Sequence, residues 1–149
     1  MDEYSTDDAD IGKFRPHGRI SFSFEGNLVV YQAEGPFNVE LLEAFAQVEP
    51  EIIQRFQQRV GPWVEVIIFE KSSLAPDECI GVFGDYLKEM KANGLAPRAS
   101  AMVIGKGVES SAYMNSCYEK CYREAGFEHR LFSNRDDALS WVKTFLPQT

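Results

Sequence analysis

The chain has 149 residues, and its 15 Lys and Arg side chains against 23 Asp and Glu give a formal net charge of −8 at pH 7. This acidity repels phosphate backbones and anionic membrane surfaces, so a nucleic-acid partner is not expected. The length suits one domain that can bury a core without a disulfide or metal staple.

The start of the chain and its hydropathy predict a location. Five of the first ten residues are acidic, unlike the basic start of a signal peptide or an Arg-rich transit peptide. No apolar run reaches the roughly 18 residues typical of a membrane span. We therefore expect a cytoplasmic protein without a membrane span.

The cysteine count predicts reduced thiols. Cys79, Cys117 and Cys121 are odd in number, which does not suit a disulfide framework. Cys117 and Cys121 are four residues apart on a predicted helix and with Cys79 would offer three soft ligands to zinc. Ordinary burial of free cysteine is the simpler explanation, and we expect neither a metal nor a cofactor.

The first elements form a hairpin. Residues 1–17 are acidic, with little apolar content, and are predicted to form a flexible N-terminal arm before a domain spanning 18–149. Residues 19–25 alternate between apolar and polar side chains, which predicts a half-buried strand. Gly26-Asn27 then makes a two-residue turn into a return strand at 28–33.

A helix and a central strand follow. Asn38 is a candidate N-cap for a helix whose apolar residues recur at helical spacing up to Phe56. Pro50 is expected to kink this helix or split it in two, because proline lacks an N–H and its ring clashes with the preceding turn. Residues 63–69 (WVEVIIF) predict a buried central strand with Glu65 as its one charged interruption.

The rest of the chain alternates helices and strands. Helices are predicted at 77–92 and 108–125, strands at 98–104 and 129–132, and a last helix is capped by Ser133 or Asn134. The order ββαβαβαβα predicts a single α/β domain with a mixed sheet, in which an antiparallel hairpin joins parallel strands through right-handed crossovers. Function in such sheets usually lies beyond the carboxyl ends of the parallel strands, here the loops 70–76 and 105–109.

Three stretches resemble a known family. They are the hairpin GRISFSFEGNLVVYQAEG, Asn38-Val39-Glu40 at the start of the first helix, and the closing FSNRDDALSWVKTFL. Together they resemble the SpoIIAA-like branch of the STAS fold, over residues 18–146. The resemblance implies a STAS-like, non-enzymatic regulatory domain that works by protein contact. It also implies an alternative, since SpoIIAA-like proteins have been regarded as binders of apolar small molecules.

The resemblance also points to a phosphorylation site. In the antagonist proteins of the family, the regulated serine stands in a pattern like Asp-Ser-Ser-Gly after the central strand. Here Lys71 replaces the Asp and Leu74 replaces the Gly around Ser72 and Ser73. Either Ser72 and Ser73 are phosphoacceptors, which a helix N-terminus would favour, or they only cap and solvate the turn.

The ligand-binding alternative rests on two helices with surplus apolar surface. We expect a small apolar, lipid-like ligand between the helices at 77–92 and 108–125, or a protein interface, at Cys79, Phe83, Tyr86, Leu87, Tyr113, Met114, Cys117 and Tyr118. The tyrosines of the second helix could instead form a homodimer. Gly81 and Gly84 in the first helix either make it a movable cover or allow close packing against a neighbour.

The chain shows little catalytic chemistry. Of its two histidines, His17 lies in the predicted arm and His129 enters the last predicted strand, where a strand-edge role is expected, so a serine or cysteine triad is not predicted. Gly105-Lys106-Gly107 is a candidate anion contact, although it lacks the spacing of a P-loop. No pair of carboxylates stands out. An enzyme is the weakest alternative and would need a polar cluster at the carboxyl-end loops.

Overall fold

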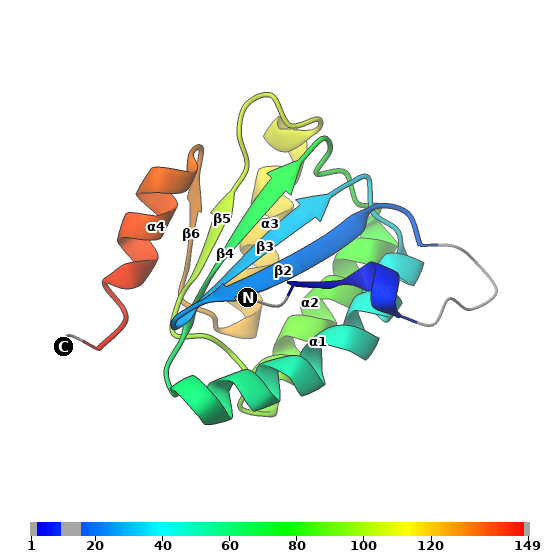
Figure 1. Ribbon diagram of the computed structural model, residues 1–149. Coiled ribbons are helices and arrows are strands. Elements are labelled where there is room, and N and C mark those ends of the chain that lie inside the picture. Colours follow the sequence, from blue (N-terminus) through cyan, green and yellow to red (C-terminus); the bar gives the residue numbers. More distant parts are fainter. Residues whose placement is uncertain (1–2, 10–15, 148–149) are drawn as a thin grey trace.

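A computed structural model describes residues 3–9 and 16–147 as a sheet with helices on both faces (Figure 1). The strands are β1 (Glu3–Ser5), β2 (Arg19–Glu25), β3 (Leu28–Glu34), β4 (Val64–Glu70), β5 (Ser100–Val103) and β6 (His129–Phe132), and the helices are α1 (Val39–Val60), α2 (Asp77–Ala92), α3 (Ser111–Ala125) and α4 (Arg135–Lys143). The α/β class and the ββαβαβαβα series from β2 onward are confirmed.

The six strands lie in the sheet in chain order. The hairpin β2–β3 is antiparallel with Glu25 opposite Leu28, and the turn residue Gly26 has a φ of +62°, a conformation that glycine adopts without steric cost. From β3 to β6 every pairing is parallel. The mixed sheet and the central place of β4, between β3 and β5, are therefore as predicted.

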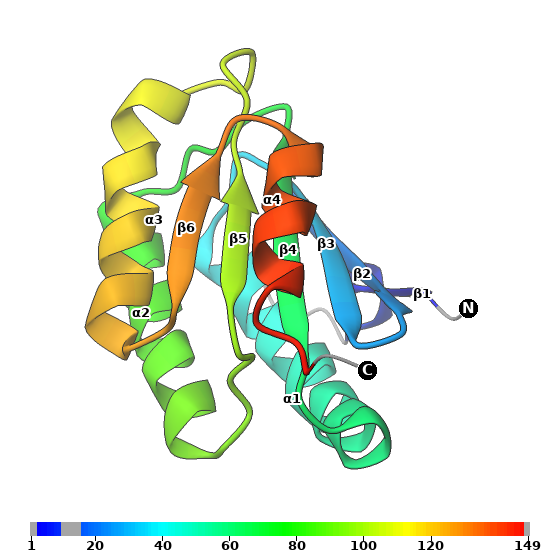
Figure 2. The same ribbon diagram turned by 90° about the vertical axis from the view of Figure 1, so that its left-hand side faces the viewer.

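The strand order decides where the helices lie. Each crossover from β3 to β6 moves one strand in the same direction across the sheet, and right-handed connections then place α1, α2 and α3 on one face. The last helix, α4, follows β6 and covers the opposite face (Figure 2). Two apolar cores result, a large one under the three helices and a smaller one under α4.

Alternation along β4 assigns its side chains to the two cores. Val64 and Val66 belong to the core under α4, while Ile67 and Phe69 belong to the core under the three helices. Because successive side chains point to opposite faces of a strand, Glu65 points with Ile67 toward the three helices. This charged residue is only 6% exposed, so a carboxyl group lies inside the larger core.

The first third of the chain departs from two expectations. The flexible arm predicted over 1–17 does not describe residues 3–8, since β1 pairs with β2 and Thr6–Asp8 form a short 3-10 turn; residues 10–15 of that arm lie outside the described residues. Of the two outcomes expected at Pro50, the split does not occur, because α1 runs from Val39 to Val60 as one helix with Pro50 inside it. The contacts of its buried face hold the helix together where proline removes one backbone hydrogen bond.

Helix ends follow local capping chemistry. Asn38 caps α1 by accepting a 3.0 Å hydrogen bond from the Leu41 N–H, and Asn134, one of the two predicted caps, does the same for α4 through the Asp137 N–H. Helix α3 begins at Ser111 rather than at 108, because residues 105–108 form a turn closed by the Val108 N–H and the Gly105 carbonyl. No helix within 3–9 and 16–147 combines the length and apolarity of a membrane span.

Candidate functional site

A cavity of about 80 Å³ lies between the sheet and the three helices of the larger core. Most of its wall is apolar, and ten of its side chains are aromatic: Tyr31, Phe37, Phe45, Trp63, Phe69, Phe83, Tyr86, Tyr118, Tyr122 and Phe127. Two acidic residues also line it, Glu49 from α1 and Glu65 from β4. A concave, mostly apolar space with a few convergent polar groups is the usual form of a small-molecule site.

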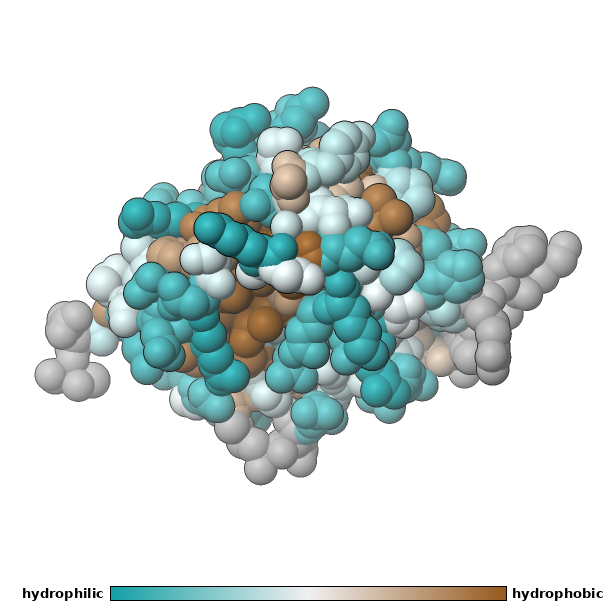
Figure 3. Space-filling view, turned by 90° about the horizontal axis from the view of Figure 1, so that it is seen from above, coloured by the Kyte–Doolittle hydropathy of each residue, from teal (hydrophilic) through white to brown (hydrophobic). Residues whose placement is uncertain are grey.

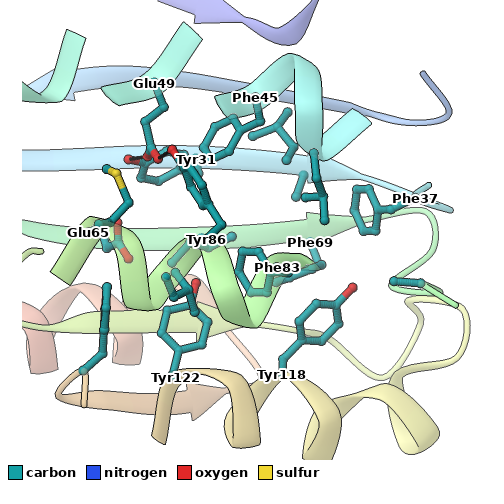
Figure 4. A pocket seen from close by; sticks show the side chains of 18 of the residues that line it. Tyr31, Phe37, Phe45, Glu49, Glu65, Phe69, Phe83, Tyr86, Tyr118 and Tyr122 are labelled. Carbon is teal, nitrogen blue, oxygen red and sulfur yellow. Dashed lines mark hydrogen bonds between the residues drawn. The ribbon is translucent and has the colours of Figure 1, made fainter. Parts of the chain in front are cut away.

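The polar groups gather at one end of this cavity. Figure 4 shows Glu49, Glu65, Tyr31 and Tyr86 together there, while Phe37 and Tyr118 lie at the other end. We call the group of four the polar end. Its members come from α1, β4, β3 and α2, so it exists only in the folded chain.

Glu49 is held by two tyrosines. Its Oε2 accepts a hydrogen bond from the Tyr31 hydroxyl, and its Oε1 accepts one of 2.6 Å from the Tyr86 hydroxyl. The side chain is 5% exposed. Burial raises the pKa of Glu49 to about 7, although the two hydroxyl donors stabilise the carboxylate and oppose that shift.

Glu65 has fewer partners. It lies opposite Ser100 in the parallel register of β4 and β5, and its Oε2 accepts a 2.7 Å hydrogen bond from the Ser100 hydroxyl. Burial, and then the nearby charge of Glu49, raise the pKa of Glu65 to about 8, and the Ser100 bond opposes this. Glu65 is therefore mostly protonated at neutral pH.

The remaining titratable groups of the wall keep their protons. Burial raises the pKa of Tyr31, Tyr118 and Tyr122 above the usual value of a phenol, and it does the same for Tyr86, where the charge of Glu49 adds to the effect. Burial also raises the pKa of the Cys79 thiol to about 11. Among the described residues, no lysine, arginine or histidine lines the cavity. Of these lining residues, the two carboxyls are thus the groups that ionise near neutral pH.

The predicted ligand residues are partly brought together. Cys79, Phe83, Tyr86 and Leu87 from α2 and Tyr118 from α3 line the cavity. The other three, all on α3, do not: Tyr113 is 66% exposed, Met114 is fully buried and Cys117 is half-buried. The cavity lies between the helices and the sheet, whereas the prediction placed the ligand between two helices.

The two glycines of α2 do not serve close packing. A Cβ built on Gly81 would meet no atom within 4 Å, and one on Gly84 would lie 3.7 Å from the Cys121 sulfur, an ordinary contact. Neither position needs glycine to admit a neighbour.

Ser72 and Ser73 are buried at the carboxyl end of β4. The Ser72 hydroxyl donates to Glu109 Oε1 at 2.9 Å, and the Ser73 hydroxyl donates to the Glu109 backbone carbonyl at 3.0 Å. Backbone bonds join the same segment to Gly35 and Phe37 on its other side. A phosphoryl group on either serine would require these contacts to open and would meet the Glu109 carboxylate.

The same end of the sheet holds the candidate anion contact. Lys106 and Gly107 are exposed, and the turn at 105–108 separates them from the first residue of α3, so the Gly105-Lys106-Gly107 amides do not form a helix N-terminus. Figure 3 looks onto this end and shows apolar surface between hydrophilic residues. Its most exposed large apolar side chains are Leu74 and Tyr113, and single exposed apolar residues are ordinary on a protein surface.

The thiols do not converge on a metal. All three cysteines are free, with Cys79 and Cys121 buried, and the Cys121 thiol is directed at the Ile80 carbonyl. Within the described ranges, no group of three or more His, Cys, Asp or Glu side chains is arranged to hold a metal ion.

Sequence reasoning missed the two carboxyls. It treated Glu65 as an interruption in a buried strand and found no pair of carboxylates that stood out. A signal existed for Glu49, because it falls four residues from both Phe45 and Ile53 on the buried stripe of α1. For Glu65, the alternation of β4 assigns the side chain to the face of Ile67.

Comparison of the chain with protein-family models, with curated proteins and with solved structures finds no match. The function is therefore argued from the cavity itself.

Proposed function

We propose that this protein binds a small, mainly apolar molecule in the cavity beneath α1, α2 and α3. The observation that carries the proposal is the pair of buried carboxyls in an otherwise apolar wall. Burying a polar group costs free energy unless every hydrogen bond is replaced. Leucine or methionine at position 65 would pack the strand without that cost, so a carboxyl at this place is expected to meet something other than the core.

The size of the cavity limits the ligand. An engineered apolar cavity of about 150 Å³ admits benzene, so a space of about 80 Å³ suits a molecule of a few carbon atoms or one end of a longer one. A longer ligand would displace adaptable side chains such as Met90 or Leu87, which also line the wall. The apolar body would lie against the aromatic rings, with a polar group at the polar end.

The proposal is tested by filling the space. Ala33 lines the cavity from β3 and is 3% exposed, so Ala33→Leu adds bulk where the ligand would lie. Binding of 1-butanol, a small amphipathic alcohol, is followed by amide NMR shifts. We expect the wild-type protein to show saturable shifts at residues of the cavity wall, and we expect Ala33→Leu to weaken binding at least tenfold.

The matched control is Ala46→Leu, which makes the same change at an exposed position of α1 and should leave binding unchanged. Native mass spectrometry of protein purified without denaturation provides a second readout that needs no variant, because a resident ligand would add a mass lost on unfolding. If butanol causes no saturable shifts in the wild type and no added mass is found, the proposal is overturned.

The protein-interaction function implied by the STAS resemblance stays a prediction. It is tested by mapping phosphate on the protein after incubation with cellular kinases. Modified Ser72 or Ser73 would support it, and it would then require the segment around Glu109 to open.

A further inference from the structure

We infer that the molecule bound in the cavity carries a cationic amine, with Glu65 as its principal counter-ion. This inference rests on the proposed function and adds the chemical class of the ligand. It is carried by the charge of the wall, by a carboxyl oxygen without a partner and by the position of aromatic rings.

The charge of the wall excludes one large class of apolar ligands. Two carboxyls line the cavity, and within residues 3–9 and 16–147 no lysine, arginine or histidine lines it with them. An apolar molecule with a carboxylate or phosphate head, such as a fatty acid, would bring a third acidic group beside Glu49 and Glu65 with no cation to pair it. A ligand carboxylate would have to be desolvated there without a cation and would be repelled by either carboxyl in its ionised form, whereas an ammonium group would be attracted to that form.

The hydrogen bonds distinguish the two carboxyls. Both oxygens of Glu49 are occupied by the hydroxyls of Tyr31 and Tyr86. Glu65 has one such bond, from Ser100 to Oε2, and its Oε1 has no hydrogen-bond partner among the described residues. The side chain is more than nine-tenths buried and lines the cavity. Once the carboxyl has lost its proton, this oxygen is an acceptor that fits a donor arriving with the ligand.

Aromatic rings complete the receptor for a cation. Figure 4 shows the ring of Tyr86 near the two carboxyls, with that of Phe45 next to it, and the centroids of these two rings are 5.8 Å apart. The faces of aromatic rings attract an ammonium group, the more so when it is desolvated. The apolar body of the amine would extend toward Phe69 and Phe83.

Amine binding should depend on pH in a characteristic way. In the empty cavity burial favours the protonated form of Glu65, and a bound ammonium favours the carboxylate, so binding releases the proton of that carboxyl to solvent. The other titratable groups that line the cavity, among the described residues, stay neutral and add no pH dependence near neutral pH: Tyr31 of β3, Cys79 and Tyr86 of α2, and Tyr118 and Tyr122 of α3. Glu49 of α1 is the one exception, and it changes in the same direction.

The experiment compares n-butylamine, 1-butanol and butyrate, which share an apolar body and differ in the head group. The amine is added as its hydrochloride at constant ionic strength, and dissociation constants are measured by amide NMR. We expect butylamine to bind at least tenfold more tightly than butanol near pH 7.5 and butyrate to bind most weakly. From about pH 6.5 to 7.5 the amine affinity should rise close to tenfold, while that of butanol stays level or falls.

Glu65→Gln keeps the size of the side chain and removes its charge. It should lower the amine affinity at least tenfold and leave butanol binding within about twofold. Glu70→Gln removes a carboxylate from the same strand outside the cavity, so it should change neither the amine affinity nor the butanol affinity.

The outcomes separate this inference from the proposed function. If butanol or butyrate binds in the cavity as tightly as butylamine, the proposed function stands and the inference of an amine ligand is overturned. If Glu65→Gln leaves the amine affinity unchanged, the assignment of its counter-ion is overturned. If none of the three causes saturable shifts at the cavity wall, both proposals fail together.

Discussion

Stability should fall as the pH rises from mildly acidic toward neutral, because Glu49 and Glu65 hold protons in the folded chain. Their pKa values are raised from 4.5 to about 7 and about 8 by burial. A group with a raised pKa binds more protons in the folded state, so its contribution to stability is greatest below the unfolded pKa. That contribution is lost as the pH rises from 4.5 toward 7 for Glu49 and toward 8 for Glu65.

The size of the effect follows from the number of protons released. Between about pH 5.5 and 6.5 both carboxyls are mostly protonated when folded and almost wholly ionised when unfolded, so each costs about 1 kcal/mol over that pH unit. The pair lowers the free energy of unfolding by about 2 kcal/mol. This loss is a large fraction of the roughly 5 to 15 kcal/mol that stabilises a typical domain.

The assay is equilibrium unfolding in guanidinium chloride at closely spaced pH values, since its ionic strength screens the exposed carboxylates. Glu65→Gln should halve the loss per pH unit and should make the protein more stable than wild type at pH 8. Glu43→Gln, at an exposed position of α1, should keep the wild-type slope. If Glu65→Gln also keeps that slope, Glu65 is ionised in the folded protein and the account of the polar end is refuted.

Three further predictions concern the surroundings of the site. Gly35→Ala places a Cβ 2.2 Å from the Ser72 carbonyl oxygen and should lower the free energy of unfolding by about 1 to 3 kcal/mol. In Gly81→Ala the added Cβ meets no neighbour, so this change should raise the free energy of unfolding by about 0.5 to 1 kcal/mol. Both variants are measured by denaturant unfolding. A loss of stability in Gly81→Ala would mean that α2 needs its glycine. Iodoacetamide should modify Cys117 in the folded protein and the two buried cysteines only after unfolding, as read by peptide mass spectrometry; early modification of Cys79 would show that the cavity opens readily.

The fold could be predicted from local patterns because each pattern had one physical meaning. Alternation in 19–25 required a strand with one buried face, and Gly26-Asn27 required a tight turn. The bounds of α2 were predicted to the residue, because acidic residues mark its first turn and Asn93-Gly94 its end. The pattern around Pro50 left a kink or a split open, because the effect of this proline depends on how well the rest of α1 is held by packing, and a local pattern does not report this.

The site could not be predicted in the same way, because its four polar residues are far apart in the sequence. Tyr31 and Glu49 meet across 18 positions, and Glu49 and Tyr86 across 37. Taken alone, each of these residues has an ordinary explanation as a side chain whose stem packs in the core and whose polar tip makes its own hydrogen bond. Only the strand order, which brings α1 and α2 over β3 and β4, turns these residues into one cluster. The apolar residues of α2 were easier to predict, since they share one helix face.

The pH dependence of stability and the preference for an amine have one physical origin, which is the cost of an ionised Glu65 in an apolar cavity. The empty protein avoids that cost by keeping the proton, and a bound ammonium removes it by pairing with the carboxylate. The two effects must therefore change together when Glu65 is altered. A variant that flattened the pH dependence of stability but still preferred the amine would assign the counter-ion to Glu49. Because both oxygens of Glu49 already accept tyrosine hydroxyls, that result would further require one of these hydrogen bonds to break on binding.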